Sequence, residues 1–236
     1  MEGQARAAGL ERLEAHLGHR FGDRALLEQA LTHRSAAGPA ASNERLEFLG
    51  DAVLGLVAAE LLYHRFPRAE EGELSRRRAW LVREQTLAEI ARELELGGLL
   101  RLGPGELRSG GFRRDSILAD ALEAVLGAVY LDGGLGAARR VVERLLGERL
   151  AHQPGPGALK DPKTRLQEWL QARRRPLPTY RVVEVGGVEH ARRYTVACEV
   201  EGLGEPTLGE GTSRRRAEQA AAARALAELE RERDAT

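Results

Sequence analysis

The sequence has little cysteine, lysine or aromatic content, and it carries no net charge. Cys198 is the only cysteine, so one chain can form neither an internal disulfide nor a thiolate metal cage. Lys+Arg and Asp+Glu both number 36, and the formal net charge is +0, so any basic surface for nucleic acid must be local. Aromatic residues make up 4% of the chain, too few to line a large aromatic substrate pocket.

Long apolar runs are also missing. Residues 1–19 carry charges and lack the apolar stretch of a secretory signal, and no run is expected to be long enough to cross a bilayer. Together with the single cysteine, this predicts a reduced cytoplasmic location and no membrane partner. The 236 residues, 42% of them hydrophobic and 31% charged, suffice for one or two compact domains.

The first part of the chain has the apolar spacing of helices. From about Leu10 to Leu150, apolar residues recur at three and four positions, and no strand-like alternation interrupts them. Pairs of Gly and Pro, as at Gly103-Pro104-Gly105 and Gly133-Gly134, mark the breaks. We predict an all-α domain over residues 8–152. Its expected helices are 8–18, 23–32, 43–66, 73–95, 114–131 and 134–151.

The period changes after a segment rich in proline and glycine. Residues 152–158 read HQPGPGA, which predicts a flexible linker over 153–158. Beyond it we expect a small α+β domain, residues 159–231, with the order α-β-β-β-α. Its elements are a helix over 164–174, strands over 179–185 and 194–200, a third short strand within 202–211, and a helix over 215–230.

Three acidic residues share one face of the expected helix over 43–66. Glu44, Glu47 and Asp51 fall within about 60° of one another at 3.6 residues per turn. Like charges at this spacing destabilise a helix by roughly 0.2–0.5 kcal/mol per pair. Because no Lys or Arg shares the stripe at i+3 or i+4, something outside this helix should compensate.

A second acidic pair lies within an apolar run. Asp120 and Glu123 are one turn apart between Ile117 and Leu126, where the neighbours require a core. A lone acidic pair is usually a solvated helix face, whereas two pairs set among apolar residues favour a metal site. If the two helices pack antiparallel, their carboxylates could form an oxygen-rich pocket for a Mg²⁺-type cation. Such a site hydrolyses phosphodiesters without a covalent intermediate.

Two segments carry a resemblance to a known family. NERLEFLGDAVL, from Asn43 to Leu54, resembles a signature of bacterial ribonuclease III. GGFRRDSILADALEAVLGAVYLDGG, from Gly110 to Gly134, is similar to the second acidic segment of that family. The resemblance extends from about Leu10 to Leu229, and its motifs are long and specific. It implies an endoribonuclease that cuts double-stranded RNA.

The resemblance also implies roles for the acidic residues. Glu47, Asp120 and Glu123 match the positions that hold Mg²⁺, for which Mn²⁺ is a substitute. Asp51, together with Glu123, matches the residues assigned to catalysis. Since no acidic position departs from the family pattern, the sequence predicts an active enzyme.

Further family positions concern the cleft and the dimer. Glu44 and Glu71 match acidic residues that line the substrate cleft, and Phe48 matches an aromatic residue that inserts into the partner subunit. The family works as a homodimer whose two sites each cut one strand, leaving 5'-phosphate and 3'-hydroxyl ends with short 3' overhangs. The implied substrates are ribosomal RNA precursors and some messenger and transfer RNAs.

The C-terminal domain resembles the double-stranded-RNA-binding domain, which reads A-form shape through 2'-hydroxyls and phosphates. Polar side chains on its first helix could meet 2'-hydroxyls, the turn over 186–193 could enter a second minor groove, and a basic cluster at a helix N-terminus suits phosphate. The residues concerned are Thr164, Gln167, Glu168, His190, Arg214, Arg215 and Arg216.

Two other functions are compatible with parts of the sequence. A non-catalytic protein that binds double-stranded RNA would use the acidic stripes only for dimerisation. A Mg²⁺ enzyme acting on diphosphates, of the helical terpenoid-synthase kind, would also need acidic pairs on two helices. The second alternative leaves the RNA-binding domain unexplained, and the chain has few aromatic residues for its pocket.

Overall fold

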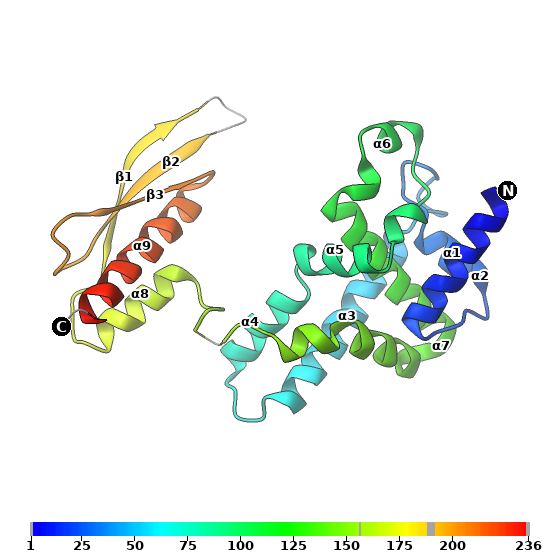
Figure 1. The fold of residues 1–236 in the computed structure, drawn as a ribbon, viewed down its shortest axis with the longest axis horizontal. Coiled ribbons are helices and arrows are strands. Elements are labelled where there is room, and N and C mark those ends of the chain that lie inside the picture. The colour runs from blue at the N-terminus through cyan, green and yellow to red at the C-terminus, as the bar shows by residue number, and fades with distance from the viewer. Residues whose placement is uncertain (1, 156, 188–191, 235–236) are drawn as a thin grey trace. The chain divides into compact units, whose positions relative to one another are not determined.

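The computed structural model describes residues 2–155, 157–187 and 192–234 (Figure 1). The chain forms two compact units, Met1–Gln153 and Pro154–Thr236. In the described residues the first unit is helical and the second has the order α-β-β-β-α. The fold class predicted from the sequence is therefore confirmed.

The first unit is built from helices of very different lengths. The α-helices are α1 (Glu2–Leu17), α2 (Arg24–Ala30), α3 (Glu44–Arg65), α4 (Glu71–Leu81), α5 (Glu84–Glu93), α6 (Pro104–Arg108) and α7 (Asp115–Ala151). Two single-turn 3-10 helices, η1 (Leu96–Gly98) and η2 (Gly111–Arg113), lie before and after α6.

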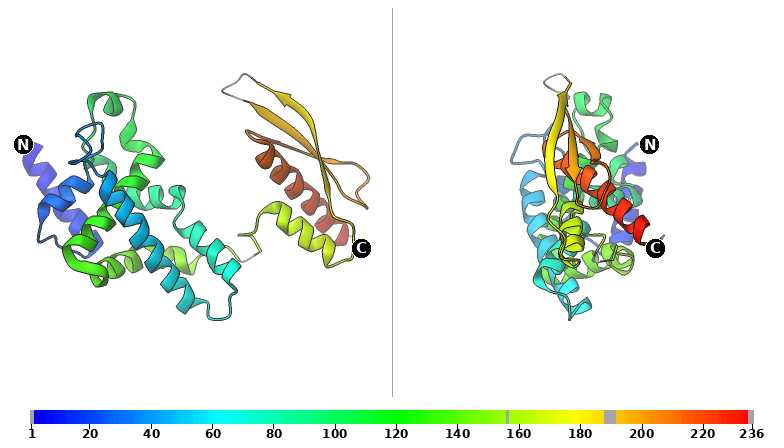
Figure 2. Two further views of the ribbon diagram at one scale, coloured as in Figure 1. Left: turned by 180° about the vertical axis from the view of Figure 1, so that it is seen from behind. Right: turned by 90° about the vertical axis from the view of Figure 1, so that its left-hand side faces the viewer.

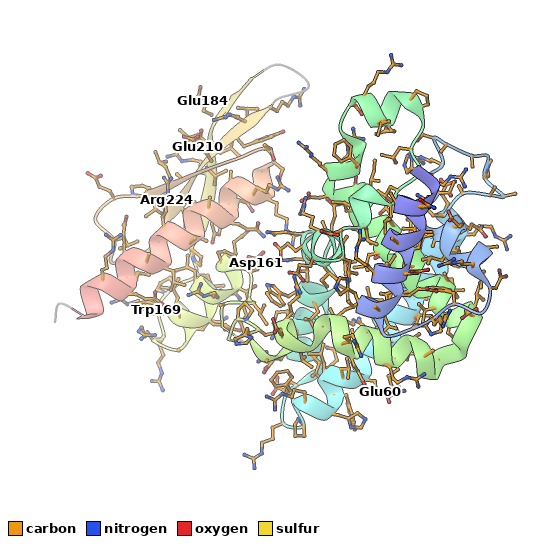
Figure 3. The ribbon with its side chains drawn as sticks, turned by 45° about the vertical axis from the view of Figure 1, so that its right-hand side comes forward. Glu60, Asp161, Trp169, Glu184, Glu210 and Arg224 are labelled. Atoms are coloured by element: carbon orange, nitrogen blue, oxygen red, sulfur yellow. The ribbon has the colours of Figure 1, made fainter. Side chains whose placement is uncertain are left out.

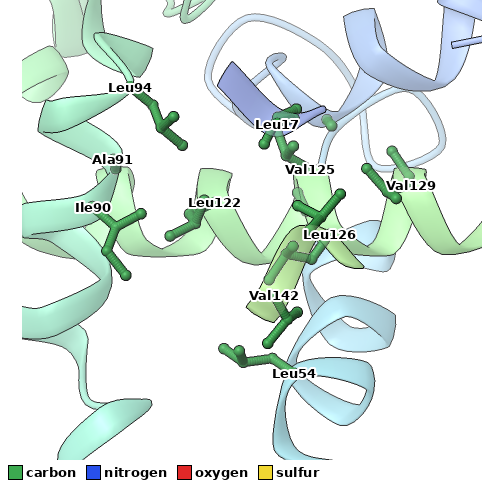
Figure 4. Close-up of a cluster of buried hydrophobic side chains, with 14 of the residues drawn as sticks. Leu17, Leu54, Ile90, Ala91, Leu94, Leu122, Val125, Leu126, Val129 and Val142 are labelled. Atoms are coloured by element: carbon green, nitrogen blue, oxygen red, sulfur yellow. The ribbon is translucent and has the colours of Figure 1, made fainter. Parts of the chain in front are cut away.

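Helix α7 runs through the core of the first unit. Its side chains Leu122, Val125 and Leu126 lie among those of α1, α3 and α5, such as Leu54 and Ile90 (Figure 4). All of these are at most 1% exposed. Because burying one such side chain contributes about 1.5–3 kcal/mol, this packing fixes α3 and α5 against α7.

The break expected at Gly133-Gly134 is confirmed, since two helical segments meet there at a kink and together form α7. Gly134 has φ 72° and ψ −177°, a backbone conformation that residues other than glycine rarely adopt. Helix α7 continues on both sides of it. The second half then returns to α3, where the Arg139 Nη1 to Glu60 Oε1 distance is 2.5 Å (Figure 3).

Helix α7 also corrects the expectation that no run could cross a bilayer. By length and composition alone, α7 is long and apolar enough to cross a membrane. However, 56% of its most apolar window is buried inside the protein, as in the core helix of a folded domain. The apolar run is explained by the core that it forms.

The helix expected over 73–95 is wrong as a single element. It is divided at Val82 and Arg83 into α4 and α5, and Arg83 has extended backbone angles. Thr86 fixes the corner, since its hydroxyl donates to the carbonyl of Trp80 at 3.0 Å. No glycine or proline lies between residues 73 and 95, so composition did not mark the corner. Gly103-Pro104-Gly105, expected as a bare turn, instead begins α6 with proline in the first turn.

The second unit packs two helices on one face of a three-stranded antiparallel sheet (Figures 1 and 2). Gly209 allows this close packing, because an added Cβ would lie 2.1 Å from the nitrogen of Ala221. The core between the layers includes Leu166, Cys198 and Leu226. The elements are α8 (Pro162–Gln171), β1 (Thr179–Gly186), β2 (Arg193–Glu199), β3 (Thr207–Gly211) and α9 (Arg214–Asp234), in sheet order β1-β2-β3.

Candidate active site

Two glycines bring α3 and α7 into backbone contact. A Cβ added at Gly50 would lie 1.7 Å from the carbonyl oxygen of Glu123. A Cβ added at Gly127 would lie 2.2 Å from the carbonyl oxygen of Leu46. Since position 46 lies against 127 and position 50 against 123, the two helices run antiparallel. This antiparallel packing is the arrangement in which the acidic residues of the two helices were expected to converge.

Three of the predicted carboxylates meet at this crossing. Glu47, Asp120 and Glu123 each offer a carboxylate oxygen, and these oxygens all lie within 4.8 Å of one another. The three side chains, which we call the acidic cluster, are partly buried. Asp51 lies one turn further along α3 and is exposed, outside this set of oxygens.

Burial and neighbouring acids raise the pKa values of the acidic cluster. Burial, followed by the charges of Asp51, Asp120 and Glu47, raises the pKa of Glu123 to about 8. Burial and then Asp120 raise the pKa of Glu47. Without a cation Glu123 therefore retains a proton at neutral pH, and a bound cation would favour the ionised form of the acidic cluster.

Glu84, which no sequence pattern links to the site, also acts on the acidic cluster. Burial raises the pKa of Asp120, and the largest charge effect on it comes from Glu84 at the start of α5. Glu84 is distant in the sequence from every acidic motif. Only the packing of α5 against α7 brings it near, so no sequence signal would have identified it.

Compensating positive charge comes from the segment between α2 and α3. The distance from Arg34 Nη1 to Glu44 Oε1 is 3.3 Å, and Arg34 lowers the pKa of both Glu47 and Asp120. His33 also lowers the pKa of Asp120. The charge pattern of α3 predicted a compensating group outside the helix, but local spacing identified neither Arg34 nor His33 as that group.

A cavity of about 430 Å³ lies beside the acidic cluster. Arg34 and Arg114 bring two guanidinium groups to it, of which Arg114 Nη1 lies 3.2 Å from Glu106 Oε2. Guanidinium groups suit phosphate oxygens, and carboxylates suit a cation. The cavity and the acidic cluster together therefore fit a phosphodiester and a cation. The lining residues are His33, Arg34, Ser35, Asn43, Glu44, Glu47, Glu106, Arg114, Ser116, Ile117 and Asp120.

Two predicted residues of the first unit lie elsewhere. Glu71 is the first residue of α4, where its carboxylate accepts a hydrogen bond from the Ser75 hydroxyl at 2.7 Å. It is not among the residues that line the cavity. Phe48 points away from the core and is 80% exposed, and Leu56 and Tyr63 further along α3 are also exposed.

The polar residues of the second unit gather where α8 and α9 begin. Asp161 accepts hydrogen bonds from the backbone of Lys163 at 2.8 Å and from the amide of Gln219 (Figure 3). Lys163 Nζ lies 2.6 Å from Glu218 of α9. These contacts hold the first turns of the two helices together.

The residues predicted to bind RNA surround these helix starts. Thr164, Gln167 and Glu168 are exposed on α8. The carboxylate of Glu168 pairs with Lys160 at 2.5 Å. Three exposed arginines, at 214–216, form the first turn of α9. His190, the predicted contact in the turn over 186–193, lies outside the described residues.

Comparison with known proteins assigns both units to families. The family described as Ribonuclease-III-like matches residues 23–150, and the Double-stranded RNA binding motif matches residues 162–229. A protein named Ribonuclease 3 from Vibrio atlanticus is 58% identical over 221 residues, which are 93% of this chain and 97% of that protein. Ribonuclease 3 from Vibrio campbellii is 57% identical over the same shares.

A solved structure is similar to the first unit. It is the nuclease domain of ribonuclease III from Campylobacter jejuni, with a TM-score of 0.58 and 45% sequence identity. The match covers 60% of this chain and 99% of that one. That structure has structural flexibility in a region involved in dimer formation.

Proposed function

Because the chain belongs to the ribonuclease III family, we propose that the acidic cluster is the catalytic centre of an endoribonuclease that cuts double-stranded RNA. Relatives that match nearly the whole chain are ribonucleases, which places it in a catalytic family rather than among non-catalytic RNA-binding proteins. The observation that supports the assignment of the centre is the convergence of three carboxylates at one helix crossing.

We propose that Glu47, Asp120 and Glu123 hold a divalent cation. All three donors are carboxylate oxygens, which suits a hard cation such as Mg²⁺, with Mn²⁺ as a substitute. Their raised pKa values fit a site whose ionised form is stabilised by a cation. When bound, such a cation lowers the pKa of a water molecule and stabilises charge on the phosphoryl oxygens.

The protein's own groups would orient the phosphodiester. Arg34 and Arg114 would donate hydrogen bonds to phosphate oxygens from the cavity beside the acidic cluster. Asp51 is exposed and close enough to raise the pKa of Glu123. We assign Asp51, with Glu123, to positioning the attacking water and accepting its proton. The products have 5'-phosphate and 3'-hydroxyl ends with short 3' overhangs.

A homodimer is supported by the outer face of α3. Phe48, Leu56 and Tyr63 are separated by eight and seven positions, so they share one side of the helix. An exposed apolar stripe of this kind commonly marks a protein interface. We propose that a second copy covers it, and that Glu71, outside the cavity of a single chain, lines the cleft spanning both copies.

The second unit would hold the duplex. Arg214, Arg215 and Arg216 meet phosphates in this proposal, and Thr164, Gln167 and Glu168 meet 2'-hydroxyls. This shape readout suits the processing of ribosomal RNA precursors and of some messenger and transfer RNAs. We further propose that the protein works in the cytoplasm, where its one cysteine would remain reduced.

Cleavage of a long duplex RNA, measured against Mg²⁺ concentration, tests the metal proposal. Neutralising Glu47 or Asp120 to Gln or Asn should raise the Mg²⁺ concentration needed, whereas Asp51→Asn should lower the maximal rate. Glu89→Gln, an exposed position on α5 outside the cavity, is the matched control. Cleavage that proceeds equally in EDTA would contradict the proposal.

A further inference from the structure

A second and larger cavity lies on the first unit, away from the acidic cluster. It measures about 1030 Å³ and lies between α1, the end of α5, η1 and η2. Its lining shares no residue with the acidic cluster or with the cavity beside it. Nothing in the proposed cleavage of RNA uses this cavity.

The inner wall of the cavity is apolar. Leu13, Leu94, Leu99 and Leu118 are buried side chains that reach it, and Phe112 adds a partly exposed ring. Pockets for small molecules typically have such walls, with a few polar groups that fix the orientation of the ligand. Its volume slightly exceeds the usual range of about 300–1,000 Å³.

The rim of the cavity is positively charged. Arg12, His16 and Arg113 are exposed there, and the guanidinium of Arg113 lies 4.9 Å from the centre of the Phe112 ring. In the described part of the chain, no carboxylate lies within 4.0 Å of Arg12 or Arg113. The one acidic residue of the lining is Glu95. The rim therefore favours a ligand with more than one negative charge.

The other two arginines of the lining already have partners. Arg6 donates to Glu28 at 2.7 Å and to the carbonyl of Leu99 at 2.8 Å, and Arg92 pairs with Asp115. These contacts hold the walls in place and leave Arg12 and Arg113 available to a ligand.

The backbone at the cavity is constrained. Glu95 has a left-handed conformation with φ 54°, which is strained for a residue other than glycine and is often found at binding sites. A Cβ at Gly97 would lie 2.4 Å from the carbonyl oxygen of Phe112, so glycine lets η1 approach η2. A Cβ at Gly98 would meet nothing within 4 Å, so its position opens onto free space.

We propose that this cavity binds a nucleoside phosphate. The base would lie on the wall formed by Leu94, Leu99 and Phe112, and the phosphates would meet Arg12 and Arg113. A fatty acid would bring one negative charge to the two available guanidinium groups of Arg12 and Arg113, and inorganic phosphate would leave the apolar wall uncovered. The combination of a planar apolar body with several charges is what the lining fits.

Fluorescence anisotropy of GDP labelled with a methylanthraniloyl group tests the proposal on the full chain. EDTA is present, so that no cation can draw nucleotides to the acidic cluster. Saturable binding is expected, with displacement by unlabelled GDP or ATP. Displacement by pyrophosphate at equal concentration would show a simple anion site, and displacement by decanoate would show an acyl site. Either result, or the lack of saturable binding, would overturn the proposal.

Two kinds of variant then locate the ligand. Arg12→Glu reverses a rim charge, and Gly98→Leu fills the open space; each should weaken binding by about tenfold or more. Arg20→Glu and Gly147→Leu are matched controls, since both positions are exposed, outside the lining, and Gly147 also has open space around it. Equal affinities for all four variants would refute the location.

Duplex-RNA cleavage by Gly98→Leu provides the folding check. The cavity is separate from the acidic cluster, so the rate should match that of the unaltered protein. If cleavage falls together with nucleotide binding, Arg12→Glu decides: lost binding with normal cleavage supports the proposal, and retained binding overturns it.

Discussion

Glu123 and Glu218 lie on long helices of the two units, yet their pKa values shift in opposite directions. Burial and three neighbouring acids raise the pKa of Glu123. A hydrogen bond from Lys163, with a further one from Arg214, lowers the pKa of Glu218. Among the residues that the structure describes, no cationic side chain pairs with the carboxylate of Glu123, whereas that of Glu218 is already paired. Glu123 is therefore suited to bind an external cation, whereas Glu218 stabilises the contact between α8 and α9.

The strongest test of this contrast replaces each glutamate in turn. Glu123→Gln should reduce cleavage of duplex RNA by roughly a thousandfold or more, because it removes a proposed metal ligand. RNA binding should remain. Glu218→Gln should leave the cleavage rate nearly unchanged and lower the melting temperature slightly, since it loses a paired charge. Gel assays of cleavage and of RNA binding, together with thermal melts, measure these effects in both variants. Equal loss of cleavage activity in the two variants would contradict the proposed difference between Glu123 and Glu218.

The contact that creates the acidic cluster can be broken without touching a carboxylate. Gly50→Ala places a Cβ against the backbone of Glu123, so we expect a loss of roughly 3 kcal/mol in the free energy of unfolding, together with lower activity. Gly55→Ala on the same helix meets nothing within 4 Å and should be neutral or stabilising by about 1 kcal/mol. Urea unfolding curves compare them, and equal stabilities would show that the close approach is unimportant.

The pH dependence of stability should reveal the raised pKa of Glu123. Its pKa rises from 4.5 to about 8 on folding, so the metal-free folded state binds the extra proton between those values. Stability in EDTA should therefore fall by roughly 2 kcal/mol as the pH rises through this window, after allowance for solvent screening. Added Mg²⁺ should oppose the fall, and Glu123→Gln should flatten it. A melting temperature that is independent of pH in EDTA would contradict this prediction.

The smallest expected effect concerns the second unit. Arg215→Ala removes one exposed cation from the first turn of α9, so duplex-RNA binding should weaken by up to about tenfold for all sequences. The slope of log affinity against log salt should fall by about 1. The maximal cleavage rate should be unchanged, in contrast to Glu123→Gln. Filter binding at several salt concentrations measures the slope, and an unchanged slope would exclude a phosphate contact at this position.

The sequence predicted the acidic residues better than their surroundings. Glu47, Asp120 and Glu123 were identifiable because acidic residues one turn apart within apolar runs are unusual. Arg34 and Glu84 were missed because neither has a periodic position relative to those motifs. Their effect depends on how α5 and the segment before α3 pack, which local spacing does not encode. The corner at Val82 was missed for a similar reason, since a hydroxyl contact rather than a composition change produces it.

Sequence alone determined the helical and α-β-β-β-α character of the two units and the helix faces that carry the acids, because side-chain periodicity follows directly from backbone geometry. The tertiary structure decided which charges meet. Gly50 and Gly127 allow the backbones of α3 and α7 to touch, and that contact brings acids some seventy positions apart within reach of one cation. Charge interactions depend on distance and burial, and both are set by packing.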